Sequence, residues 1–347
     1  MNAFAQNLLE WYNPKNRNLP WKKTKDAYKI WLSEIIMQQT RVEQGTPYYL
    51  KFVEQYPSIK DLANAPLDDI LKLWEGLGYY SRARNLQSAA KQVVEQYNGK
   101  FPNNYEDILK LKGVGNYTAA AVASFAYNVP FAVVDGNVFR VLSRVFGVEL
   151  PIDSNEGKKY FQQLAQQLLD KKNPAKYNQA IMDFGALVCK PKNPLCDDCP
   201  FQSNCKALAS NKIDVLPIKS KKLIKTDRFF HYFVLFDDEF ILIQQRTQND
   251  IWKDLFEFPL IETKNEKLPK THLFSDLIQP KQYKKSSFVY KQTLSHQHVY
   301  ARFYEIKLKE LPKPKKSMIK IEKSKLFSQT FPKIVRSYLE DRFNYLS

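Results

Sequence analysis

Apolar side chains in the first two thirds of the chain recur every three to four positions. From residue 1 to about residue 210, only short stretches with Pro, Asn or Gly interrupt this spacing, which predicts a succession of amphipathic helices. One helical stretch covers residues 26–44 and begins at a capping residue, Asp26, and another covers residues 67–99. Two further helices should flank residues 111–115. This region is therefore expected to be mainly α.

The pattern changes after a short segment that has no helical periodicity. Residues 211–226 are rich in Lys and include Pro217, which is typical of a linker. Beyond them, aromatic and β-branched runs predict strands, and one amphipathic run predicts a closing helix. The strands are expected at 228–236, 239–246, 287–294 and 298–308, and the helix near 331–342.

We therefore predict two domains, since 347 residues exceed the ~100–200 residues of a typical single domain. The first is a mainly α domain over 1–210, the second an α+β domain over 227–347, and residues 211–226 join them.

Charge narrows the class of partner. The chain carries 53 Lys and Arg against 36 Asp and Glu, a net charge of +17, and such an excess indicates a polyanion, with nucleic acid first. A basic surface that only confers solubility is the alternative. No apolar run approaches the ~18 residues that span a bilayer, and the N-terminus is unlike a signal peptide. We expect a cytosolic monomer, associated with the nucleoid in a bacterium.

All four cysteines lie within residues 189–205, in the spacing C-x6-C-x2-C-x5-C. They are Cys189, Cys196, Cys199 and Cys205. A disulfide framework would join distant segments, so this clustering favours a metal or cluster site in a reducing compartment. Zinc and an iron-sulfur cluster both accept four thiolates, and the spacing leaves both open.

Histidine is absent from the first 230 residues, since the four histidines are His231, His272, His296 and His298. Acid and base chemistry in the first domain must therefore depend on carboxylates, Tyr or Lys.

The run LKGVGNYTAAAV places two glycines, Gly113 and Gly115, between two helices. We expect a cap near Asn103, with Glu106 completing a capping box, and then a tight hairpin whose backbone N–H groups form a phosphate-binding nest. An ordinary corner between helices is the alternative.

Two carboxylates in the first domain have contrasting predicted surroundings. Glu34 has Ile30, Trp31 and Met37 on the same helical face, and apolar surroundings raise the pKa of a carboxyl group. Asp135 precedes an amphipathic helix as its N-cap, where backbone donors and the helix dipole favour the ionised form. A protonated acid beside an anion is the arrangement that cleaves glycosidic bonds. The alternatives are a boundary glutamate and an aspartate that only caps.

The motifs together resemble the adenine DNA glycosylase family of the helix-hairpin-helix, endonuclease III-like superfamily. The likeness covers most of residues 8–210 and extends more faintly into the C-terminal domain. The motifs that carry it, in the family's order, are WLSEIIMQQTRV, GLGYYSRARNL, GVGNYTAAAV, VVDGNVFRVLSR, YNQAIMDFGALVC and the four-cysteine loop.

The resemblance implies a helical glycosylase domain that holds a structural 4Fe-4S cluster on the four cysteines, and a Nudix-like C-terminal domain that senses oxidised guanine. It implies that Glu34 protonates adenine and that Asp135 stabilises the oxocarbenium ion or a transient adduct, supported by Tyr117 and Asn137. The implied adenine pocket consists of Arg17, Leu19, Trp21 and Gln179. The residues implied to separate the two DNA strands and to contact the partner guanine are Gln39, Thr40, Leu77 and Tyr79. The implied phosphate site is Gly113, Val114 and Gly115, and the implied oxoguanine-reading pair is Ser295 and His296.

One position distinguishes the members of the superfamily that also cleave the DNA strand from those that only remove the base. Lyase members of the superfamily have a nucleophilic lysine where this chain has Tyr117, and a phenol cannot form a Schiff base. The resemblance therefore implies a monofunctional enzyme that removes adenine from A:8-oxoguanine or A:G mispairs in double-stranded DNA.

Two departures from the family pattern are Lys112, where a Pro is frequent, and WKDLFEFP at 252–259, where a Gly-rich form is common. The Nudix catalytic box is absent from the sequence, so phosphohydrolase activity is not expected. The rival functions are a bifunctional glycosylase/lyase and a non-catalytic DNA-binding protein with structural zinc.

Overall fold

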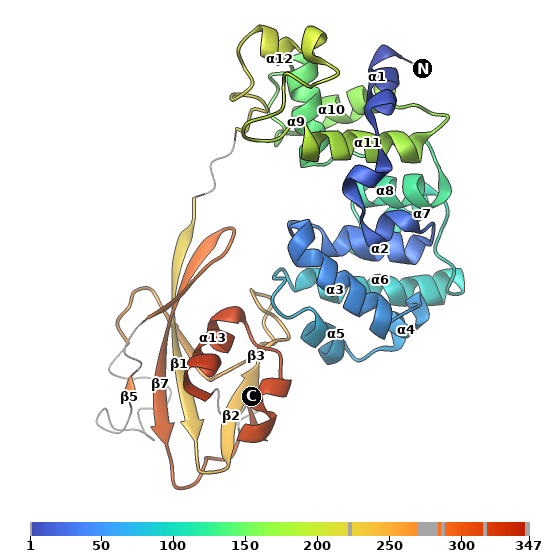
Figure 1. The fold of residues 1–347 in the computed structure, drawn as a ribbon. Coiled ribbons are helices and arrows are strands. Elements are labelled where there is room, and N and C mark those ends of the chain that lie inside the picture. Colours follow the sequence, from blue (N-terminus) through green and yellow to red (C-terminus); the bar gives the residue numbers. More distant parts are fainter. Residues whose placement is uncertain (1, 221–223, 269–283, 286–288, 315–317, 344–347) are drawn as a thin grey trace. The chain divides into compact units, whose positions relative to one another are not determined.

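A computed structural model describes residues 2–220, 224–268, 284–285, 289–314 and 318–343 (Figure 1). The chain divides into two compact units. The first comprises Met1–Ala65 and Asn85–Lys222, and the second comprises Pro66–Arg84 and Leu223–Ser347. The domain boundaries expected at residues 210 and 227 stay a prediction.

The first unit is built from helices, as expected. They are α1 (Ala3–Trp11), α2 (Ala27–Ile36), α3 (Val42–Gln55), α4 (Ile59–Asn64), most of α6 (Ser81–Tyr97), α7 (Tyr105–Lys110), α8 (Asn116–Tyr127), α9 (Gly136–Phe146), α10 (Asn155–Leu168), α11 (Pro174–Leu187) and α12 (Lys206–Ala209). Two short 3₁₀ turns, η1 (Pro14–Arg17) and η2 (Pro20–Lys23), lie between α1 and α2.

The helical stretch predicted over residues 26–44 is wrong in its extent. It begins as expected, because the Asp26 side chain accepts the N–H groups of Tyr28 and Lys29, but α2 ends at Ile36 and α3 begins only at Val42. In the turn between them Gln39 has a φ of 54°. Residues 38–41 are Gln, Gln, Thr and Arg, so neither Pro nor Gly marked the break.

The stretch predicted over residues 67–99 is also two helices. Helix α5 (Leu67–Leu73) belongs to the second unit, and α6 starts at Ser81. Between them Gly76 and Gly78 have φ values of 98° and 73°, which residues with a side chain rarely adopt.

Helix α8 lies at the centre of the first unit, between α2 and α11 (Figure 1). Its alanines at 119–123 are all buried, and such small side chains let neighbouring helices approach closely. The helices predicted to flank residues 111–115 are α7 and α8, which confirms that prediction.

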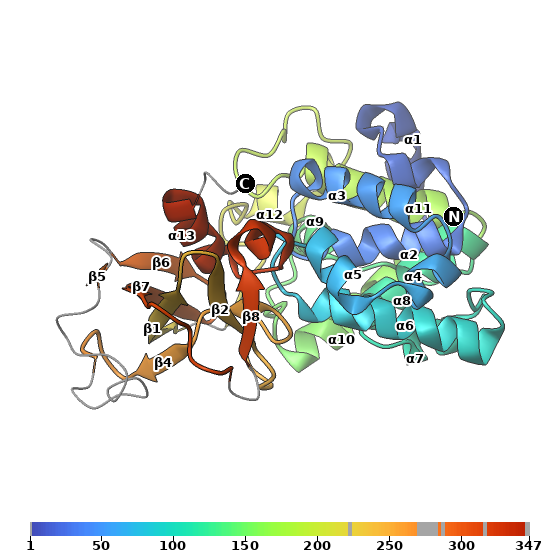
Figure 2. The same cartoon turned by 90° about the horizontal axis from the view of Figure 1, so that it is seen from below.

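The second unit contains a mixed β-sheet (Figure 2). Its strands are β1 (Thr226–Phe236), β2 (Phe240–Gln245), β3 (Phe256–Glu257), β4 (Leu260–Thr263), β5 (Lys284–Lys285), β6 (Tyr290–Thr293), β7 (Gln297–Lys307) and β8 (Met318–Glu322). The order is β3-β2-β1-β7-β5, with β4 paired to β1, β6 to β7 and β8 to β2. Strands β1 and β7 are parallel, with Phe230 opposite Ala301, and the other pairs are antiparallel.

Helix α13 (Lys333–Phe343) packs on this sheet through aromatic contacts. The ring of Tyr338 stacks on that of Phe303, with centroids 3.8 Å apart and planes 3° from parallel. The α+β prediction is thereby confirmed, together with the closing helix. Of the strand predicted at 287–294, β6 covers Tyr290–Thr293, and residues 287–288 lie outside the described ranges. No helix within those ranges is long and apolar enough to cross a membrane.

Candidate active site

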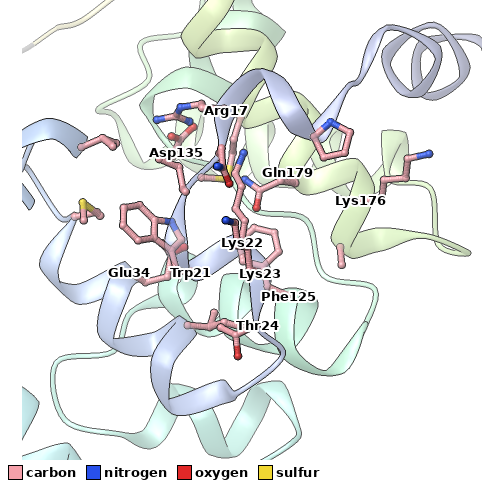
Figure 3. Close-up of a pocket in the computed structure, with 18 of the residues that line it drawn as sticks. Arg17, Trp21, Lys22, Lys23, Thr24, Glu34, Phe125, Asp135, Lys176 and Gln179 are labelled. Carbon is pink, nitrogen blue, oxygen red and sulfur yellow. The ribbon is translucent and has the colours of Figure 1, made fainter. Parts of the chain in front are cut away.

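The first unit contains a cavity of about 650 Å³ that brings together most of the predicted site residues (Figure 3). Helices α2, α8, α9 and α11 contribute to its walls, and the η1–η2 segment covers it. The predicted residues that line it are Arg17, Leu19, Trp21, Glu34, Thr40, Tyr117, Asp135, Asn137 and Gln179. These residues come from segments far apart in the sequence.

Glu34 is a buried acid, as its apolar neighbours predicted. Its side chain is 8 % exposed, and the Tyr117 hydroxyl donates a 2.6 Å hydrogen bond to its Oε2 atom. Burial and, to a smaller extent, the negative charge of Asp135 raise the pKa of Glu34 to about 7, although the hydrogen bond from Tyr117 acts in the opposite direction. Glu34 can therefore hold a proton near neutral pH.

Asp135 caps α9 with both of its carboxylate oxygens engaged. Oδ1 accepts the backbone N–H of Val138 at 2.8 Å, and Oδ2 accepts the side-chain amide of Asn137 at 2.8 Å. The cap confirms the predicted position. These hydrogen bonds favour the ionised form, as expected, but burial outweighs them and raises the pKa of Asp135 above its ordinary value.

Tyr117 occupies the first turn of α8, directly after the glycine hairpin. Burial, together with the charges of Glu34 and Asp135, holds the pKa of Tyr117 well above its usual value. The phenol is therefore a fixed hydrogen-bond donor to Glu34 at any pH at which the protein functions.

Asn137 is oriented by an arginine that the sequence analysis missed. Arg140 donates from Nη2 to Asn137 Oδ1 at 2.8 Å and to the Gly185 carbonyl at 2.6 Å, and from Nε to the Cys189 carbonyl at 2.7 Å. A continuous hydrogen-bonded path thus joins Asp135 to the first residue of the cysteine loop. The available signal was local, because Arg140 follows Asn137 by three residues on one helix.

A buried ion cluster, also missed, secures the η1–η2 segment to α11. Asp183 is 1 % exposed, and its two oxygens pair with Arg17 at 3.1 Å and with Lys22 at 2.5 Å. Lys22 lines the cavity, and burial lowers its pKa despite the contact with Asp183. About 160 residues separate these partners, so no local pattern could have revealed the cluster.

The hairpin between α7 and α8 needs glycine for both space and backbone conformation. Gly113 has a φ of 75°, and a Cβ there would lie 2.7 Å from Cβ of Asn85. Gly115 is the N-cap of α8. Because glycine has no side chain, Gly115 does not accept a hydrogen bond from the first N–H groups of α8. Lys112, the departure from Pro, donates its backbone N–H to Gln92 Oε1 at 2.7 Å.

The predicted cap of α7 is one residue out of register. The N-cap is Asn104, whose side chain accepts the backbone N–H of Asp107. The capping box expected from Asn103 and Glu106 is therefore wrong. Two adjacent asparagines made the sequence ambiguous at this point.

Four predicted residues lie in the second unit and line one cavity of about 430 Å³. They are Leu77, Tyr79, Ser295 and His296. The hydroxyl groups of Tyr79 and Ser295 are hydrogen-bond partners. Gln39, in the turn after α2, lines neither this cavity nor the one around Glu34.

The four cysteines line one small, largely apolar cavity formed by α9, α11, α12 and the loop that joins the last two. Arg144 Nη1 donates to the sulfur of Cys189 at 3.6 Å, and the backbone N–H of Phe201 donates to the sulfur of Cys199 at 3.4 Å. Within the described ranges, no three His, Cys, Asp or Glu side chains are placed to hold one metal ion. Four clustered thiols with N–H donors aimed at sulfur fit an anionic thiolate cluster.

Comparison with known proteins agrees with both parts of the fold. Residues 32–171 match the HhH-GPD superfamily of base excision DNA repair proteins, and residues 231–341 match the NUDIX domain. A thermostable thymine-DNA glycosylase structure superposes with a TM-score of 0.56 at 33 % identity, covering 60 % of this chain and 95 % of that one. An endonuclease III–DNA complex superposes with a TM-score of 0.52 at 22 % identity, covering 60 % and 94 %.

Sequence comparison identifies the family within that superfamily. The adenine DNA glycosylase of Buchnera aphidicola subsp. Baizongia pistaciae is 40 % identical over 270 residues, which cover 76 % of this chain and 75 % of that protein. This level of identity extends over most of both proteins, so the chain belongs to the adenine DNA glycosylase family.

Proposed function

We propose that this protein hydrolyses the bond between adenine and deoxyribose in duplex DNA, where adenine is mispaired with 8-oxoguanine or guanine. Membership of the adenine DNA glycosylase family supports the reaction. One observation carries the residue assignment: a buried acid, Glu34, whose pKa is raised to about 7, shares a cavity with the capped carboxylate of Asp135.

The reaction begins when the adenine nucleotide is flipped out of the duplex, at a cost of a few kcal/mol for unstacking. Glu34 donates its proton to the adenine ring, so that the base departs with the electron pair of the glycosidic bond. Asp135 stabilises the positive charge that develops on the sugar, directly or as a transient adduct, and water then adds at the same carbon. Asn137 and Tyr117 hold the two carboxylates in place.

The base itself is recognised by the walls of the cavity. Trp21 offers an aromatic surface, and its ring is fixed edge-on against Tyr49 with centroids 5.2 Å apart. Arg17, Leu19 and Gln179 complete the adenine subsite. The hairpin at Gly113, Val114 and Gly115 binds a phosphate of the flipped strand through the N–H groups of its glycines, since the Val114 N–H donates to the Leu111 carbonyl at 3.1 Å.

The reaction stops at an abasic site, because the position of the lyase nucleophile is occupied by Tyr117. Lys22 is one of four lysines that line the cavity, and Asp183 holds its ammonium group at 2.5 Å. We therefore expect no covalent complex on borohydride treatment, which would distinguish this enzyme from a bifunctional glycosylase/lyase.

Reading of the partner base is assigned to six residues, of which Thr40 lines the catalytic cavity and the other five do not. Gln39, Thr40, Leu77 and Tyr79 separate the strands and contact the partner guanine, and Ser295 and His296 detect its oxidation. For the pair at Tyr79 and Ser295, the support is their shared cavity in the second unit.

A 4Fe-4S cluster is proposed for Cys189, Cys196, Cys199 and Cys205. Such a cluster is structural and positions DNA, and it takes no part in hydrolysis. A broad visible absorbance lost on oxidation would support it. A colourless protein with stoichiometric zinc and no glycosylase activity would favour a DNA-binding protein with structural zinc.

The test is release of adenine from duplexes that pair it with 8-oxoguanine, guanine, cytosine or thymine. We expect cleavage opposite 8-oxoguanine and guanine, and sparing of the normal pair with thymine. Glu34→Gln should abolish adenine release while it leaves duplex affinity largely intact. Near-normal turnover of that variant would contradict the acid role, and excision of thymine opposite guanine without excision of adenine would contradict the proposed substrate.

A further inference from the structure

The catalytic cavity extends well beyond the groups assigned to adenine. Pockets of roughly 300–1,000 Å³ accommodate whole drug-sized ligands, and this one measures about 650 Å³. Its lining includes Phe125 near the end of α8, the C-cap residue Asn128 and Ala175 at the start of α11, in addition to the catalytic groups. A single purine base therefore occupies only part of it.

Helices α8 and α11 run in opposite directions along this cavity. Tyr117, at the start of α8, contacts Glu34, and Gly185, near the end of α11, lies against Asn137. At the other end Asn128, which ends α8, accepts a 3.5 Å hydrogen bond from the backbone N–H of Ala175. The cavity thus has a catalytic end and a second, outer end, with Gln179 between them in Figure 3.

The outer end opens to solvent. Lys23, Lys25, Asn128, Asn173 and Lys176 line it and are all exposed. The half-buried ring of Phe125 also lies there. An aromatic ring with side-chain amides beside it can hold a neutral aminopurine weakly, by stacking and by hydrogen bonds.

This opening lies near the end of α8, whereas the proposed phosphate site lies before its start. The proposed phosphate site at Gly113–Gly115 immediately precedes α8, next to Tyr117. Phe125 is eight residues further along, or about 12 Å at 1.5 Å per residue. The outer end and the proposed phosphate site therefore lie at opposite ends of α8.

We infer that the outer end is the exit route for free adenine, an inference that rests on the proposed function. After the glycosidic bond breaks, the base passes Gln179 and leaves between Phe125 and Ala175, while the abasic duplex remains bound. Release of the base is then independent of release of the DNA, which is often the slow step for enzymes that bind their product tightly.

The route is tested by narrowing it without changing the catalytic groups. Ala175→Trp fills the half-buried outer end, and Lys176→Trp narrows its rim from an exposed position where loss of folding is not expected. Lys171→Trp is the matched control, because Lys171 is exposed and does not line the cavity. Each protein is mixed in excess with an A:8-oxoguanine duplex that carries labelled adenine.

Three quantities are followed: abasic sites by alkaline strand cleavage, free adenine by passage through a filter that retains protein, and duplex release by fluorescence anisotropy. The unmodified protein and Lys171→Trp should release adenine as fast as abasic sites form, before the duplex dissociates. Ala175→Trp and Lys176→Trp should form abasic sites at the normal rate but lose this early release of adenine.

Prompt release of adenine by both narrowed variants would overturn the exit route. So would retention of adenine by the unmodified protein until a competitor displaces the abasic duplex. If Ala175→Trp forms no abasic sites, the rate of adenine release by Lys176→Trp alone decides whether the exit route is correct. Absence of abasic sites with the unmodified protein would instead overturn the proposed function, and the route with it.

Discussion

Removal of one hydroxyl group should move the pH dependence of catalysis in a direction that the structure specifies. Catalysis requires the protonated form of Glu34, so the rate of the unmodified enzyme should fall as the pH rises through about 7. The Tyr117 hydroxyl donates to the Glu34 carboxylate at 2.6 Å and thereby lowers the pKa of Glu34. In Tyr117→Phe this stabilisation of the ionised form is lost, and the pKa of Glu34 should rise.

The magnitude follows from the energy of that hydrogen bond. A hydrogen bond to a charged group contributes about 1.5–3 kcal/mol, and the protonated acid retains part of it, so the lower value applies. Because about 1.4 kcal/mol corresponds to one pKa unit, the high-pH limb of the profile should move upward by about one unit.

The assay is the single-turnover rate of abasic-site formation as a function of pH. Tyr177→Phe is the matched control, since the Tyr177 hydroxyl is buried and has no hydrogen-bond partner within the described structure. The high-pH limb of the Tyr177→Phe profile should coincide with that of the unmodified enzyme. A Tyr117→Phe limb that coincides with that of the unmodified enzyme, or lies below it, would refute the coupling, whatever the maximum rate of the variant.

Three further outcomes are expected. Glu34→Gln should increase the free energy of unfolding at pH 8. The pKa of Glu34 is about 7 in the folded protein and 4.5 ordinarily, so its contribution to stability is complete below pH 4.5 and is lost as the pH rises through 7. Gln carries no charge and avoids this loss. The gain is about 3 kcal/mol, and equal urea midpoints at pH 8 would contradict it. Asp183→Asn should leave the half-buried Arg17 and Lys22 without their anionic partner and cost up to about 3 kcal/mol, and an unchanged urea midpoint would rule out that contribution. Cys199→Ser should reduce bound iron and visible absorbance, whereas unchanged iron content would exclude Cys199 as a ligand.

Local sequence patterns predicted the parts of the site that depend on a single helix. The apolar neighbours of Glu34 indicated its burial, and the position of Asp135 before an amphipathic run indicated its cap. Both features are set within a few residues of the side chain, where helical periodicity and capping preferences act. The break at 37–41 was not predicted because neither Pro nor Gly marks it, and the break at 74–80 was not predicted because apolar residues continue through that turn.

Features that depend on distant segments could not be predicted in this way. Asp183 binds Arg17 and Lys22 only because α11 packs against the η1–η2 segment. The pKa of Asp135 shows the same limit: its cap predicts a lower value, but burial by several elements raises it. Desolvation depends on the assembled tertiary structure, which no local pattern contains.

The absence of histidine from the first unit gives Glu34 a distinctive spectroscopic environment. No imidazole titrates near neutral pH anywhere in residues 1–222, and the pKa of Glu34 lies at about 7. Burial also raises the pKa of Glu257 in the second unit. Infrared difference spectra between the unmodified protein and Glu34→Gln, with unlabelled Glu in a ¹³C-labelled background, would assign the C=O stretch of the protonated acid to Glu34. That band could be followed while a duplex binds, so the proton that leaves with adenine could be observed in the enzyme before the base departs.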